Sequence, residues 1–211
     1  MSHSLHRYGH EESLQNDYTF YIRTSRGVNR EGCGPKLRQA FKIVLSERPT
    51  NFGHTRAGSF ASGLGPEEFV KTLDNAVGVQ CVFSNKEKIK SVLKKVKEAD
   101  MGISVIVSGL IDDIVQMAKE VGLKPHTAFL SLGIHGNKSL LAEEKVLEIT
   151  TMCGHGMVSA KLAKKVIENV KNGKMNIKEG AHLVAKQCLC GIFNTDRCEA
   201  ILMRSISMYD R

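Results

Sequence analysis

The residues best suited to chemistry in this 211-residue chain are cysteines, four of which lie in its last third. Cys153 begins the sequence Cys-Gly-His-Gly, and Cys188, Cys190 and Cys198 follow it in a second group. The first residues lack the apolar core of a signal peptide, so we expect a cytoplasmic protein. Thiols kept in a reducing compartment are more often metal ligands or reactive groups than disulfides. The cysteines therefore indicate metal or thiol chemistry.

Three of these cysteines form the predicted metal site. Cys153 lies where a predicted strand passes through a glycine loop into a predicted helix, whose free N–H groups would lower a thiol pKa. Cys188 and Cys190 are one residue apart and precede Gly191, which lets the backbone turn so that both can bind one group. Thiolates suit zinc or an iron–sulfur cluster. Because Cys198 falls on the packing face of a predicted helix, a place in the core is favoured for it over a role as a fourth ligand.

Two histidines and the glycine loop are predicted to support this metal site. A site with three protein ligands keeps an open position, as catalytic metal sites do. His135 and His155 stand beside glycines in turns, and a histidine transfers protons readily near neutral pH. The cofactor-binding residues that we predict around the loop are Gly154, Gly156 and Ser159.

A second loop carries the predicted substrate-binding residues. Residues 46–66 contain four glycines and little periodicity, which is typical of a functional or disordered loop. Within it, Arg56 could bind a carboxylate or phosphate with both arms of its guanidinium group, and His54 and Ser59 lie nearby in the sequence. A mobile surface loop without a binding role is the alternative.

Composition limits the partners. The net charge is +8, and many lysines fall on predicted helices, which favours either solvated helix faces or attraction to anions. The chain has no tryptophan and only 6% aromatic residues, which disfavours a site that stacks single-stranded bases. No apolar run is long enough to span a membrane. We expect a small anionic substrate; nucleic acid is less favoured, and a homo-oligomer is allowed.

The pattern of elements predicts an α/β fold. Strands are predicted at residues 77–83, 103–107, 127–134 and 146–152, with helices at 85–98 and 110–121 between the first three. Alternating strands and helices are typical of a small, largely parallel sheet of three or four strands. The connection 135–145 is short for a crossover, so the fourth strand could instead be antiparallel. We divide the chain into an N-terminal strand–helix region with the glycine-rich loop (1–76), a sheet core (77–155) and a C-terminal helical segment (156–211).

Two functional hypotheses follow. The first is an enzyme with a cysteine-ligated metal or iron–sulfur cluster that acts on a small anionic metabolite. The second is a metal- or redox-sensing binding protein, with nucleic acid contacts through its basic helices. An enzyme requires a deep pocket that joins Cys153, His135, His155 and Arg56, whereas a sensor requires an exposed basic face and no such pocket. A metal-free protein whose cysteines pack in the core is the third alternative.

Overall fold

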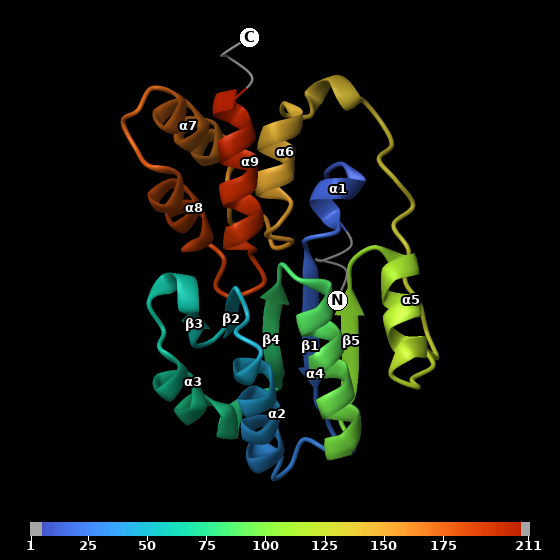
Figure 1. Ribbon diagram of the computed structural model, residues 1–211. Helices are drawn as coiled ribbons and strands as arrows, with labels where there is room; N and C mark the ends of the chain where they lie inside the picture. The colour runs from blue at the N-terminus through green and yellow to red at the C-terminus, as the bar shows by residue number, and fades with distance from the viewer. Residues whose placement is uncertain (1–5, 208–211) are drawn as a thin grey trace.

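The computed structural model describes residues 6–207, which form a sheet layer and a helical region stacked end to end (Figure 1). The strands are β1 (Tyr18–Arg23), β2 (Asn51–His54), β3 (Gly58–Ser59), β4 (Gly78–Phe83) and β5 (Ser104–Ser108). The helices are α1 (Glu11–Leu14), α2 (Gly34–Ser46), α3 (Pro66–Thr72), α4 (Lys86–Ala99), α5 (Ile111–Glu120), α6 (Glu144–Thr150), α7 (Ala160–Lys171), α8 (Ile177–Ala185) and α9 (Thr195–Ser207). Short 3-10 turns are η2 (Phe60–Ser62), η3 (Leu73–Asn75) and η4 (Lys138–Leu140).

The sheet is antiparallel throughout, so the prediction of a largely parallel sheet is wrong. Its five strands lie in the order β3-β2-β4-β1-β5, and every neighbouring pair is antiparallel. The unit β4-α4-β5 does exist, but β1 lies between its two strands and pairs with both. The same holds for β1-α2-β2, which has β4 between its strands. The sheet thus consists of two interleaved split β-α-β units with one added hairpin strand.

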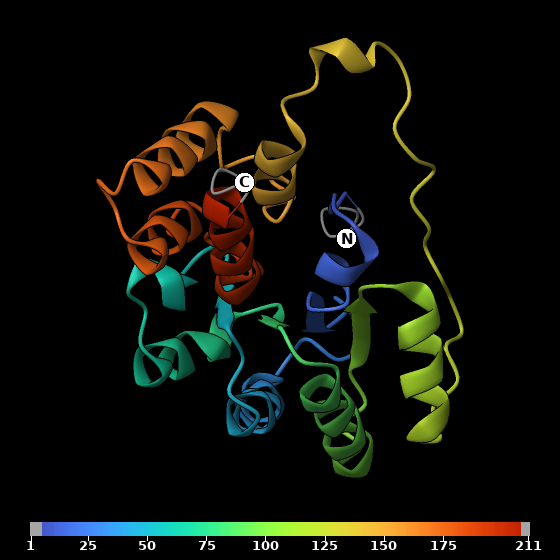
Figure 2. The ribbon, with the colours of Figure 1, turned by 45° about the horizontal axis from the view of Figure 1, so that its top comes forward.

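Two predicted strands do not form. Residues 127–134 are extended but belong to no strand, and Figure 2 shows the chain between α5 and α6 as an arc outside the body. Residues 146–152 instead lie largely in α6. Val146 and Ile149, three positions apart, are buried on one face of that helix, and this spacing also suits a helix. A strand needs a partner for its backbone groups, and neither segment has one.

The loop predicted at residues 46–66 is also more structured than its glycines suggest. It forms the hairpin β2–β3 and the turn η2, in which Ser59 caps Ser62 and Ser62 caps Ser59 in return. The predicted strands 77–83 and 103–107 are confirmed within a few residues as β4 and β5, and the predicted helices 85–98 and 110–121 as α4 and α5. The C-terminal segment is helical, as expected. β5 lies at the sheet edge and is partly exposed, rather than buried on both faces.

Two hydrophobic cores divide the molecule. Helices α2 and α4 cover one face of the sheet, where Phe20, Ile22 and Cys81 are fully buried. The second core lies among α6–α9 and includes Ala61 from η2. None of the helices that the structure describes combines the length and the apolar character needed to cross a bilayer.

Candidate thiol site

The helical region brings Cys153, Cys188 and Cys190 together, as predicted from the sequence. Cys153 lies in the turn after α6, and the other two lie in the turn between α8 and α9. Cys188 Sγ is 3.6 Å from Cys190 Sγ and also hydrogen-bonds with Cys153. All three side chains are buried, with exposed fractions of 2%, 0% and 1% in chain order. We refer to Cys153, Cys188 and Cys190 as the thiol cluster.

Hydrogen bonding orders the acidity of the three thiols. A bond to Cys188 and burial raise the pKa of Cys153 far above its usual value. The bond from Cys153 lowers the pKa of Cys188, but its bond to Cys190 and burial outweigh this and raise that pKa to about 11. At Cys190 the bond from Cys188 lowers the pKa, and the charge of Arg7 adds a smaller effect. Cys190 is therefore the thiol that ionises first.

Backbone N–H groups also point at these sulfurs. His155 and Met157 each provide a backbone hydrogen bond that favours the Cys153 thiolate, and Ile192 does so for Cys188 and Cys190. Such donors stabilise a charged sulfur that burial otherwise disfavours. At Cys153 and Cys188 these donors offset only part of the opposing effects, because the pKa of both thiols stays raised.

Gly191 lets the cysteine turn lie directly on strand β2. Its φ is +77°, and a Cβ placed on it would lie 2.1 Å from the carbonyl carbon of Phe52. Gly53 makes a similar close approach to the carbonyl oxygen of Leu189. Asn51 closes the contact, because its Nδ2 donates to the Phe193 carbonyl oxygen at 3.1 Å. The thiol cluster is therefore fastened to the sheet by backbone contacts.

The cluster does not surround a point where an ion could sit. Among residues 6–207, no three or more histidine, cysteine, aspartate or glutamate side chains are arranged to hold a metal ion. Cys188 contacts both other thiols, whereas Cys153 and Cys190 affect each other only through charge. Cys198 is buried separately in α9, where burial raises its pKa.

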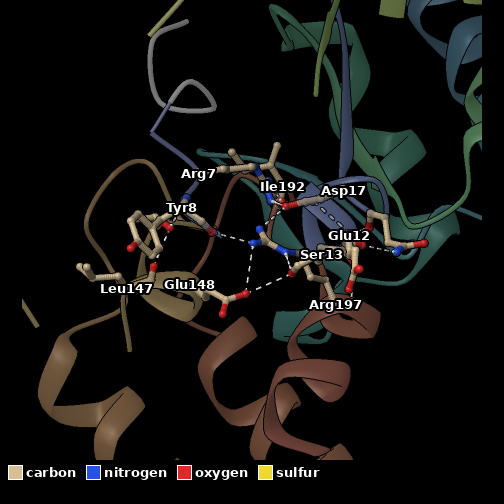
Figure 3. Close-up of polar contacts among 12 residues, drawn as sticks. Arg7, Tyr8, Glu12, Ser13, Asp17, Leu147, Glu148, Ile192 and Arg197 are labelled. Carbon is tan, nitrogen blue, oxygen red and sulfur yellow. Dashed lines mark hydrogen bonds and ion pairs between the residues drawn. The ribbon is translucent and has the colours of Figure 1, made fainter. Parts of the chain in front are cut away.

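A buried charge cluster, which the sequence analysis missed, lies next to this turn (Figure 3). Arg197 of α9 is 1% exposed at its side chain and donates to Asp17 Oδ2 at 2.7 Å and to the Tyr8 carbonyl oxygen at 2.6 Å. Arg7 pairs with the same Asp17 carboxylate and donates to the Ile192 carbonyl oxygen. Glu148 lies 3.7 Å from Arg197. We call Arg7, Asp17, Glu148 and Arg197 the arginine cluster.

The arginine cluster ties the N-terminal segment to the helical region. Its members are as far apart in the chain as Asp17 and Arg197, so no spacing could have revealed it. The only available signal was the presence of arginine inside an otherwise apolar helix face. Because the charges are paired and hydrogen-bonded, this cluster is suited to holding elements together.

The predicted catalytic histidines are both exposed. His135 lies in the extended segment, and its Nε2 is 2.8 Å from the Leu132 carbonyl oxygen. The side chain of His155 is at the surface of the turn after Cys153. In the predicted cofactor loop, Ser159 caps α7 by accepting from the Leu162 N–H, and Gly156 has a φ of +69°. Gly154 lies in the same turn.

The predicted substrate-binding residues lie on the β2–β3 hairpin, where two of them have structural partners. His54 Nε2 is 3.0 Å from Thr72 Oγ1, and burial and Arg56 lower its pKa. Ser59 is buried as a cap, and Arg56 is exposed. None of the contacts described for these three residues involves a cysteine. Their substrate-binding role therefore stays a prediction.

Three of the six lysines of α4, part of the predicted basic face, form ion pairs. Lys86 pairs with Asp113, Lys90 with Glu120 and Lys95 with Glu47.

A shallow apolar depression lies between α7 and α9. It is lined by Val170, Met175, Ile177 and Ile206, together with polar residues at the start of α8. The depression includes no member of the thiol cluster.

Comparison with known proteins found no relative: no family model, curated protein or solved structure matches the chain.

Proposed function

We propose that this protein is a thiol-based metal sensor in which Cys153, Cys188 and Cys190 bind one thiophilic ion such as Zn²⁺. The observation that supports this most is the sulfur-to-sulfur contact of the thiol cluster. Two thiolates on one tetrahedral zinc, each about 2.3 Å from the ion, lie about 3.8 Å apart. The 3.6 Å between Cys188 and Cys190 is close to that separation.

The same distance favours a single ion over a [4Fe–4S] cluster. In that cluster each iron carries one protein thiolate, so the cysteine sulfurs stand farther apart. Cys153 must turn from Cys188 toward Cys190 for all three sulfurs to reach one ion. Its turn, residues 153–157, is exposed at His155 and Met157. This local rearrangement would be the signal that reports binding.

Burial favours sensing over catalysis. With exposed fractions of 2% or less, the three sulfurs offer no surface to a substrate. The exposed His135 and Arg56 have their described partners elsewhere. A buried thiol site that opens only to accept an ion fits a sensor, whereas an enzyme needs standing access for its substrate.

Competitive zinc titration of anaerobically purified protein tests the proposal. We expect one Zn²⁺ per chain for the native protein and for Cys198→Ala, which removes a buried thiol of the same region outside the cluster. Cys188→Ser should weaken binding by roughly 100-fold or more, because loss of a direct ligand exceeds the 10–100-fold cost of losing a supporting group. Equal zinc binding by Cys188→Ser and the native protein would overturn the proposal.

A further inference from the structure

The sheet face that α2 and α4 leave uncovered carries a second polar site. Side chains alternate along a strand, so the burial of Phe20 and Ile22 against the helices turns Tyr21 to the opposite face. In the sheet register Tyr21 is opposite Gln80 on β4 and Ile106 on β5. The cysteine turn meets this face over β2, where Leu189 approaches Gly53, and Cys190 of the same turn acts on Tyr21 through its charge.

Unsatisfied polar atoms gather around Tyr21. Within residues 6–207, three buried side-chain nitrogen or oxygen atoms have no hydrogen-bond partner: Arg7 Nε, Arg30 Nε and Gln80 Oε1. Two of these belong to residues that act directly on the Tyr21 phenol, Arg30 through its charge and Gln80 through a hydrogen bond. Gln80 is 7% exposed. A buried acceptor without a hydrogen bond destabilises the fold, so its presence here points to a missing partner.

Two arginines bring positive charge to this site, and the charge of Cys190 acts on Tyr21 in the opposite direction. Arg23 and Arg30 both act on Tyr21, and within residues 6–207 neither forms an ion pair with a carboxylate. Gly78, opposite Arg23, leaves room for the phenol ring, since a Cβ there would lie 2.8 Å from Tyr21 Cε2.

We propose that Tyr21, Arg23, Arg30 and Gln80 form a binding site for a phosphate or phosphate monoester. The guanidinium groups and the Tyr21 hydroxyl donate to the anion's oxygens. Gln80 Oε1 requires a donor, which a protonated phosphate oxygen supplies and sulfate at neutral pH does not. This site differs from the predicted anion-binding residues of the β2–β3 hairpin, and none of its four residues belongs to the thiol cluster.

Tyrosine emission provides a direct probe, because the chain has four tyrosines and no tryptophan. Inorganic phosphate added to the full chain should change this emission with saturation, and sulfate should bind at least about threefold more weakly. Arg30→Met should weaken phosphate binding at least about tenfold, as expected for a charged hydrogen bond of 1.5–3 kcal/mol. Gln80→Met should reduce the preference for phosphate over sulfate.

Two controls make the test specific. Arg26→Met removes an exposed arginine from the same loop that has no described contact with Tyr21, and it should leave phosphate affinity within about twofold of native. Cys188→Ser should bind phosphate like the native chain, so failure of the metal proposal would leave this one standing. Equal losses in Arg26→Met and Arg30→Met would mean a diffuse charge effect and overturn the site, as would an absence of saturable phosphate binding by calorimetry.

Discussion

The arginine cluster and the thiol cluster lie at the two ends of one turn, yet they solve the problem of buried polarity in opposite ways. Arg197 and Asp17 carry full charges and satisfy them with short hydrogen bonds. The thiols are neutral when protonated, and their contacts with one another are weak hydrogen bonds. A charge pair of this kind cannot change state without large cost, whereas a set of thiols can lose protons and gain an ion. The first cluster is thus suited to structure and the second to response.

Removal of Arg197 tests the structural half of this comparison and should have the largest effect. Arg197→Met leaves Asp17 buried with one of its two cations gone, which should reduce the free energy of unfolding by about 3–5 kcal/mol. Arg204→Met is the matched control, because Arg204 contacts Glu148 at 2.9 Å from a side chain that is 45% exposed. Its cost should stay below about 1 kcal/mol. Urea unfolding measures both; similar costs would show that the arginine cluster is not a structural tie.

The sequence revealed the local elements and the cysteine trio but not the partners. Apolar alternation in 77–83 and the helical stripe in 85–98 depend on nearby residues, so both were predicted correctly. The insertion of β1 between β4 and β5 depends on contacts about sixty to ninety residues apart, which no local pattern contains. Segment 127–134 has strand-like residues but lacks a partner, and propensity alone does not form a strand.

The same limit applies to the candidate site. The one-residue spacing of Cys188 and Cys190 predicted that they lie together. Cys153 was added to the predicted site because it is a cysteine, although it lies far from the other two in the sequence. That prediction of proximity is confirmed. The link between Asp17 and Arg197 had no counterpart in composition or motif, because any acid in the chain could have been the partner.

Substitution of Gly191 tests whether stability depends on the close contact between the cysteine turn and strand β2. Gly191→Ala and Gly173→Ala both place alanine at positive φ, 77° and 66°, which costs about 1–2 kcal/mol. Only Gly191 also meets backbone atoms, whereas nothing lies within 4 Å of a Cβ at Gly173. We therefore expect Gly191→Ala to cost a further 1–3 kcal/mol or so from overpacking. Equal melting temperatures for the two variants would show that the cysteine turn can move away from β2 without a loss of stability.

Cys188 itself should contribute little to stability. Cys188→Ala removes one buried sulfur and two weak contacts, so the free energy of unfolding should fall by about 1 kcal/mol, well below the cost of Arg197→Met. Cys198→Ala, from the same core, should cost a similar amount. If Cys188→Ala proves as costly as Arg197→Met, the thiol cluster is a structural element and the contrast between the two clusters is lost.

The remaining effect that we expect is a difference in alkaline pH dependence. The pKa of Cys188 rises from its ordinary value of 9.0 to about 11 in the folded chain, and that of Cys153 is also raised. Because folding favours the protonated thiols, their contribution to stability is complete below pH 9 and is lost as the pH rises toward 11. Arginine does not titrate in this range, so the arginine cluster keeps its contribution.

Urea midpoints of the native chain and of Cys153→Ala/Cys188→Ala, measured at about pH 8 and about pH 10.5, isolate that contribution. Lysines and tyrosines titrate equally in both proteins, so their effect cancels in the comparison. The native chain should lose more stability than the double variant over this interval. If the urea midpoints of the two proteins fall equally between these pH values, the thiols ionise as readily in the folded chain as in the unfolded chain. The fold would then not hold the thiols in their protonated form, and the contrast with the arginine cluster would be lost.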